Sequence, residues 1–153
     1  MAREELVENL NAALSIELAG VIQYSQHSYL VTGTDRMIYK DFFRDNAGEA
    51  QDHAETLGDK IVALGGVPTV EPAMIRQSTE VSEMLKQNLE LEREAMAAYM
   101  AAWSSCDNSD LPQKFWLEER ISDEQLHIEE LEKLTNERKS RVNSERIILR
   151  EVS

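Results

Sequence analysis

Residues that interrupt regular structure are scarce in this sequence. It has six glycines and three prolines among 153 residues, and most of them fall near three places, at residues 33–34, 65–72 and 108–112. Glycine and proline are the residues least compatible with a helix interior. The stretches between these places are rich in Ala, Leu, Glu, Gln, Arg and Met, which favour helices. The sequence therefore predicts an all-α protein with a few long helices.

Cysteine and long apolar runs are also nearly absent. A single cysteine, Cys106, excludes an internal disulfide and indicates a reducing compartment. The N-terminal segment lacks the apolar core of a secretory signal, and no run of about 18 apolar residues could cross a bilayer. We therefore expect a cytoplasmic protein that does not bind to a membrane.

Positive charge is in short supply, with 16 basic residues against 29 acidic ones and a formal net charge of -13. Binding to nucleic acid depends on a basic surface that neutralises phosphates, so we do not expect a nucleic-acid partner. An acidic protein attracts cations, including metal ions. The same charge could also serve solubility alone.

The spacing of the breaks predicts a four-helix bundle of the ferritin-like class. The expected helices are residues 3–32, 36–64, 79–106 and 111–138. The first and third connections are short, so each joins an antiparallel hairpin, whereas the long connection over residues 65–78 can cross the bundle and leave the second and third helices parallel. We assign residues 1–140 to the bundle. Residues 141–153, with the apolar run 147–149, form a tail, a short fifth helix or a subunit contact.

Two glutamates interrupt apolar stripes that have the spacing of a buried helix face. The two stripes have the same residues in the same order, Leu10–Glu17–Tyr24 and Leu85–Glu92–Tyr99, and the second stripe lies 75 residues after the first. A lone ionised glutamate in a core costs several kcal/mol unless it is paired. Two such residues at matching heights favour a shared pair of divalent metal ions, although each could instead face solvent.

Two of the three histidines add to this pattern. His127 follows Glu124 by three residues, so the two share a helix face. A Glu-x-x-His on each of two helices, with one Glu from each of the other two, is the ligand set of carboxylate di-iron bundles. His53 lies 74 residues before His127 and occupies the matching place on the first hairpin.

The motif around His53 is incomplete, because Ala50 stands where the glutamate is expected and Glu49 lies one residue earlier. Residues four apart also share a helix face, so we take Glu49 as a sixth metal ligand. Alternatively, Glu49 and its counterpart Asp123 orient the imidazole rings without binding metal.

Residues 5–138 resemble the bacterioferritins and related ferritin-like proteins. The similar segments are LNAALSIELAGVIQYSQH, HAETLGDKIVALGGVP, LELEREA and DEQLHIEELE. The resemblance implies terminal ligands at Glu17, Glu92 and His127, a bridging ligand at Glu124, a catalytic tyrosine at Tyr24 and a further histidine, His27, near the site. It also implies a ferroxidase that stores iron inside a hollow homo-oligomeric shell, with ferrous iron and dioxygen or hydrogen peroxide as its partners.

The sequence departs from that family at two positions. Ala50 replaces the second bridging carboxylate, and Gln51 stands where the haem-ligating methionine is found, so we do not expect haem. Carboxylates with imidazole suit iron or manganese, and Tyr24 could donate an electron, hydrogen-bond the oxidised site or only fill the core.

Three other functions are weaker interpretations of the same residues. A rubrerythrin-like peroxidase would need Cys-x-x-Cys pairs, which the sequence lacks. A miniferritin-like protein places its site between subunits and does not use a Glu-x-x-His on the fourth helix. A non-enzymatic metal-binding bundle leaves Glu17 and Glu92 without a role.

Overall fold

The computed structural model describes residues 2–136, which form four helices and, within that range, no strand. The helices are α1 (Ala2–Leu30), α2 (Arg36–Ala63), α3 (Val81–Ser105) and α4 (Leu111–Thr135). The predicted all-α class is confirmed, and the predicted helix ends differ from these bounds by no more than three residues. In the described part of the chain, no helix could span a membrane. The predicted tail or fifth helix at 141–153 lies outside the described residues.

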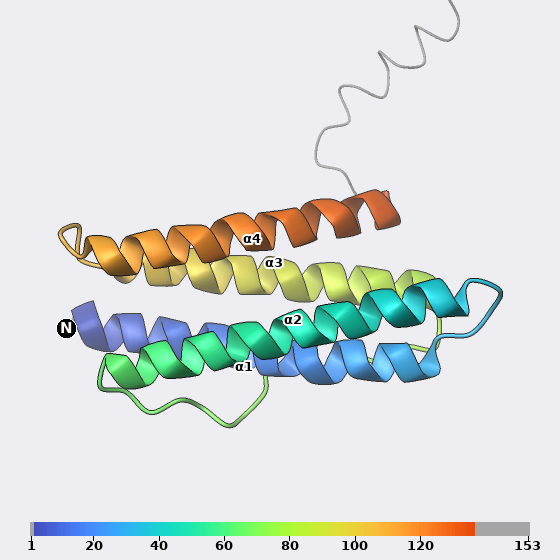
Figure 1. The fold of residues 1–153 in the computed structure, drawn as a ribbon, viewed down its shortest axis with the longest axis horizontal. Coiled ribbons are helices and arrows are strands. Elements are labelled where there is room, and N and C mark those ends of the chain that lie inside the picture. The colour runs from blue at the N-terminus through green and yellow to red at the C-terminus, as the bar shows by residue number, and fades with distance from the viewer. Residues whose placement is uncertain (1, 137–153) are drawn as a thin grey trace, which may run out of the picture.

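The helices form two antiparallel hairpins, α1–α2 and α3–α4, joined by the long segment that follows α2 (Figure 1). This segment returns along the bundle, so α2 and α3 run in the same direction, as predicted. In the centre α1 packs against α3, while α2 packs on α1 and α4 packs on α3. Over residues 2–136, α2 and α4 make no close backbone contact. Only side chains can therefore join these two outer helices.

Apolar packing fills both ends of the bundle and leaves a polar layer in the middle. One cluster includes Leu10, Leu57 and Leu117, and the other includes Phe43 and Leu89. Each buried side chain of this size contributes about 1.5–3 kcal/mol of hydrophobic stabilisation. The two clusters hold the four helices in register on either side of the middle layer.

The crossover segment is fixed to the helices by several polar contacts. The backbone N–H of Thr69 donates to Asn11 Oδ1 at 2.8 Å, and the backbone N–H of Arg76 donates to Gln23 Oε1 at 2.9 Å. The Arg76 guanidinium also pairs with Glu90 of α3 at 3.0 Å. These contacts hold the parallel α2–α3 topology in place.

Helices α1 and α2 pack tightly where Gly20 faces Ala50. A Cβ added at Gly20 would lie 3.3 Å from the Cβ of Ala50, which is tighter than most contacts between real side chains. Small residues on both helices permit this approach. Ala50, which is 6% exposed, therefore packs in the core at the level of the polar layer.

Candidate metal centre

Three glutamates lie in the polar middle layer of the bundle. Glu17 of α1, Glu92 of α3 and Glu124 of α4 are 5%, 8% and 1% exposed, respectively. The apolar stripes direct Glu17 and Glu92 inward, so neither of them faces solvent, and Glu124 of α4 is buried as well. Such burial without a compensating charge would be costly, and the layer is correspondingly rich in other polar groups.

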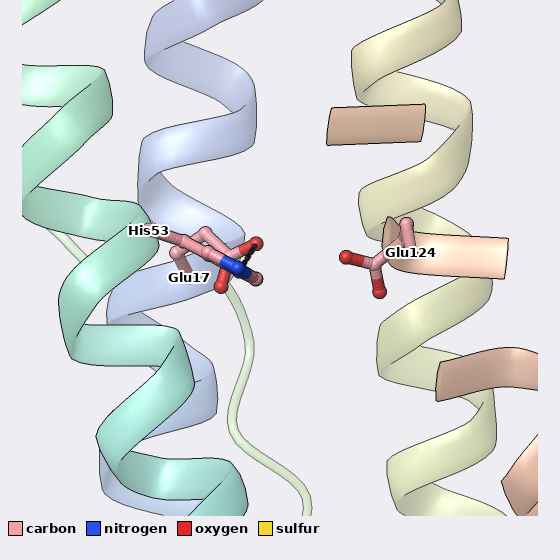
Figure 2. Close-up of side chains that lie close together, drawn as sticks. All are labelled: Glu17, His53 and Glu124. Carbon is pink, nitrogen blue, oxygen red and sulfur yellow. Dashed lines mark ion pairs between the residues drawn. The ribbon is translucent and has the colours of Figure 1, made fainter. Parts of the chain in front are cut away.

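The three glutamates form two overlapping clusters with the histidines of α2 and α4. Glu17, His53 and Glu124 have potential ligand atoms within 4.8 Å of one another, and so do Glu92, Glu124 and His127. Figure 2 shows Glu17 and His53 side by side, with Glu124 facing them across the bundle interior. Glu124 belongs to both clusters and therefore lies between two potential metal positions.

Two tyrosines reach across the central helix pair to the outer glutamates. The hydroxyl of Tyr24 on α1 donates to Glu92 Oε1 on α3 at 2.6 Å, and the hydroxyl of Tyr99 on α3 donates to Glu17 Oε1 on α1 at 2.9 Å. Sequence reasoning singled out Tyr24 but gave Tyr99 no role. The signal for Tyr99 was its place in the 75-residue repeat.

Burial governs the protonation of this layer in the absence of metal. Burial and the negative charge of Glu92 raise the pKa of Glu124 to about 12, and burial also raises the pKa of Glu17. Burial lowers the pKa of His53, but the contact with Glu17 outweighs this effect, and the net shift is upward. Burial and the charge of the facing glutamate raise the pKa values of Tyr24 and Tyr99. The phenols therefore stay protonated.

The donor set fits a pair of divalent transition-metal ions. Neither carboxylate oxygen of Glu124 has a well-formed hydrogen bond within the described chain, although buried polar atoms nearly always find a partner. Glu17 Oε1 lies 3.5 Å from His53 Nδ1. At this distance both side chains can direct a ligand atom toward the same cation. Three carboxylates with two imidazoles suit iron or manganese better than calcium or magnesium.

The histidine side of the centre is its more exposed side. The rings of His53 and His127 are stacked with centroids 6.0 Å apart, and their side chains are 14% and 22% exposed. They cross the space between α2 and α4, where the backbones do not touch. A metal ion can therefore approach the buried carboxylates from this side.

Glu49 lies at the outer edge of this opening and in neither cluster. Its Oε2 lies 2.6 Å from Nε2 of His127, on the opposite helix, and its side chain is 52% exposed. The structure thus places Glu49 against His127 rather than beside His53, its neighbour on α2. This contact leaves Nδ1 of His127 available to a metal.

The remaining predicted positions lie outside the two clusters. Asp123 pairs with Arg120 at 3.1 Å rather than with an imidazole. His27 is buried, with Nε2 3.2 Å from Gln87 Oε1 and its ring against Phe43. The exposed Gln51 donates to Glu55 Oε1 at 3.1 Å.

Known proteins have the same fold and similar sequences. The family model described as "Ferritin-like domain" matches residues 7–150. The chain belongs to the ferritin-like family, which includes the bacterioferritins. The resemblance predicted from the sequence is thereby confirmed.

Two curated relatives of this ferritin-like chain illustrate the breadth of the family. Bacterioferritin from Brucella melitensis biotype 1 is 35% identical over 134 residues, which cover 84% of this chain and 81% of that protein. A nutrient stress-induced DNA-binding protein from Synechococcus sp. is 33% identical over 75 residues, which cover 49% of this chain and 43% of that protein. The bacterioferritin thus matches nearly the whole bundle, and the second relative matches half of it.

Two solved structures have the same ferritin-like architecture. A ferritin-like, diiron-carboxylate protein from Bacillus anthracis str. Ames has a TM-score of 0.84 and 34% identity, and the match covers 88% of this chain and 98% of that one. A dodecameric thioferritin, the bacterioferritin-related protein from Bacteroides fragilis, has a TM-score of 0.78 and 26% identity, with 88% and 86% covered.

Proposed function

We propose that this protein oxidises ferrous iron at a binuclear site inside each chain and stores the ferric product. The observation that carries the proposal is the position of Glu124, which lies in both ligand clusters and keeps two buried oxygens without well-formed hydrogen bonds. A single carboxylate in this position can serve two cations at once. Membership of a family that includes bacterioferritins and diiron-carboxylate proteins supports iron as the metal.

In this proposal the two clusters define two metal positions. Glu17 and His53 would hold one ion, Glu92 and His127 would hold the other, and Glu124 would serve both. The metal-free site keeps Glu124 protonated, since burial raises its pKa to about 12. Binding of ferrous iron must displace that proton, as it does for other acidic ligands.

The reaction needs little acid–base work from the protein. Two ferrous ions are the substrate and lose one electron each. With two protons, this electron pair reduces dioxygen to hydrogen peroxide, or hydrogen peroxide to two waters. The protein's residues hold the two ions close together in a layer whose three glutamates are buried. Tyr24, the predicted catalytic tyrosine, hydrogen-bonds Glu92 from the buried side, which supports a role in holding that carboxylate.

For Glu49 we propose a role as the hydrogen-bond partner that orients His127. Its contact with Nε2 at 2.6 Å and its position outside both clusters support this role over that of a sixth ligand. Metal-binding histidines usually donate their second N–H to such a partner, which fixes the ring and its tautomer. The site would then have three carboxylate ligands and one bridge.

Storage requires a hollow assembly, and we propose a closed homo-oligomer. The Bacteroides fragilis relative is dodecameric, and closed symmetric assemblies are the usual form of homo-oligomers. A cytoplasmic location and the absence of haem belong to the same proposal. Light scattering of the purified protein tests the assembly, and a monomer at micromolar concentration would remove storage from the proposal while leaving oxidation.

Stopped-flow oxidation of Fe(II) tests the enzymatic part. The parent protein should oxidise about two Fe(II) per chain in a fast first phase, with dioxygen and hydrogen peroxide compared as oxidants. A variant with exposed Glu129 changed to Gln is the matched control for charge and should behave like the parent. Tight binding without a fast phase would identify a non-enzymatic metal-binding bundle instead.

A further inference from the structure

The two buried tyrosines are related by the same repeat as the glutamates they contact. Tyr24 of α1 bonds to Glu92 of α3, and Tyr99 of α3 bonds to Glu17 of α1. Each tyrosine is 1% exposed, and each crosses the central α1–α3 interface. Core packing alone does not require both hydroxyls to end on the carboxylate of the opposite hairpin.

The hydrogen bonds distinguish the glutamates from one another. Glu17 and Glu92 each have one oxygen that already accepts a phenol hydrogen bond, so a lone pair on that oxygen is occupied. Neither oxygen of Glu124 has such a partner among the described residues. A carboxylate that bridges two ions uses both of its oxygens. Among the described residues, Glu124 contacts Glu92 but accepts no hydrogen bond from a tyrosine, and it is the one glutamate that lies in both clusters.

We infer that Tyr99 and Tyr24 are matched positioning residues, each of which holds one glutamate as a single-oxygen ligand at its own metal position and leaves the bridging position to Glu124. This inference rests on the proposed binuclear site. It assigns Tyr99 to the Glu17–His53 half and Tyr24 to the Glu92–His127 half. The high pKa values that burial gives both phenols keep them protonated, so they remain donors over the working pH range.

Because each tyrosine is assigned to one metal position, a positioning role can be distinguished from a purely structural one. A tyrosine needed only for packing would affect both metal positions through the fold, whereas a positioning tyrosine affects the position of its own glutamate. Replacement of a hydrogen-bond partner of a metal ligand typically lowers metal affinity about 10–100-fold. Phenylalanine keeps the ring and removes only the donor.

Binding of Co(II) to the metal-free protein tests the assignment without any turnover. The starting variant is His53→Ala, which should reduce the parent's two Co(II) per chain to one, held by Glu92, Glu124 and His127. In this background Tyr24→Phe should weaken the remaining ion about 10–100-fold, and Tyr99→Phe should leave it unchanged. In His127→Ala the remaining ion is the one held by Glu17, His53 and Glu124. There Tyr99→Phe should weaken binding about 10–100-fold, and Tyr24→Phe should leave it unchanged. Tyr39→Phe is the control, because Tyr39 stacks on Phe43 and lies outside both clusters.

The outcomes separate this inference from the proposed function. A parent protein that binds no pair of Co(II) ions would remove the proposed function and the inference with it. If the parent binds two ions and His53→Ala binds one, but both phenylalanine variants act alike on that ion, the inference alone is wrong. Thermal unfolding of each metal-free variant identifies loss of fold, and if one phenylalanine variant does not fold, the other decides the matter in both histidine backgrounds.

Discussion

The two hairpins of this protein supply the metal centre with similar but unequal sets of residues. On the central helices, α1 and α3, the residues match, and Glu17 with Tyr24 has its counterpart in Glu92 with Tyr99. On the outer helices they differ. Helix α4 contributes both a glutamate and a histidine, whereas α2 contributes His53 and an alanine in place of the second glutamate.

The physical reason for the inequality is visible at Ala50. The Cβ of Ala50 faces Gly20 where α1 and α2 pack tightly, and alanine has no carboxylate to extend from there into the centre. The nearest acid on α2, Glu49, extends instead across the opening to His127 of α4. The comparison supports the proposal that one carboxylate, Glu124, serves both metal positions, and it shows Glu49 of the first hairpin in contact with His127 of the second.

The largest effect is expected at Glu124, where the two halves meet. Glu124→Ala should abolish paired binding and slow iron oxidation by more than the roughly 100-fold that marks the upper range for loss of an orienting partner. The reason is that both metal positions lose a ligand at once. Stopped-flow absorbance after mixing with Fe(II) measures the rate, and a near-parent rate would show that Glu124 does not bridge.

A smaller effect is expected at Glu49 if it only orients His127. Glu49→Ala should lower metal affinity or oxidation rate about 10–100-fold, and two ions per chain should still bind at raised concentration. Glu55→Ala, an exposed glutamate on the same helix, is the control and should act like the parent. A loss as large as that of Glu124→Ala would instead make Glu49 a ligand.

The missing bridge can be restored to make the hairpins more equal. Ala50→Glu keeps the Cβ in its packed position and adds a second candidate bridge, so iron oxidation should become several-fold faster. Without metal, the same variant should unfold at lower temperature, because it buries another carboxylate. Ala50→Gln controls for size and should not accelerate oxidation. Slower oxidation by Ala50→Glu would indicate a site already filled by Glu49.

The smallest effect concerns the stability of the metal-free protein as a function of pH. The pKa of Glu124 rises from 4.5 to about 12 on folding, so its contribution to stability is complete below about pH 4.5 and is lost as the pH rises toward 12. Glutamine is neutral at every pH, so Glu124→Gln does not lose stability in this way as the pH rises. The unfolding temperature of Glu124→Gln relative to the parent should therefore increase between pH 5 and pH 9 by at least about 2–4 °C, which corresponds to about 1 kcal/mol.

The control for this comparison is Glu129→Gln on the exposed face of α4. Its unfolding temperature relative to the parent should stay constant over the same pH range. A constant difference for Glu124→Gln as well would show that Glu124 is ionised in the metal-free fold.

Much of this architecture follows from helical periodicity. The scarcity of breakers gave the four helices, and the apolar stripes directed Glu17 and Glu92 into the core. The i to i+3 spacing brought Glu124 and His127 to one face. These features depend on residues close in sequence, where helix geometry is regular.

The contacts between helices could not be predicted in the same way. Periodicity assigns Glu49 to a face of α2 but does not give the width of the gap to α4. The sequence therefore left two roles open for Glu49, a metal ligand or a partner that orients an imidazole, and the structure places it against His127. The Tyr99 hydrogen bond to Glu17 depends on the relative height of α1 and α3. Asp123, considered as a partner of the histidines, turns to Arg120 on its own helix.

The number of ferrous ions bound per chain tests the central claim most directly. Anaerobic titration of the metal-free parent with Fe(II), followed by equilibrium dialysis, should saturate at about two ions per chain, and Glu124→Ala should bind no pair. Saturation of the parent at one ion, or the absence of any tight site, would contradict a binuclear centre shared through Glu124.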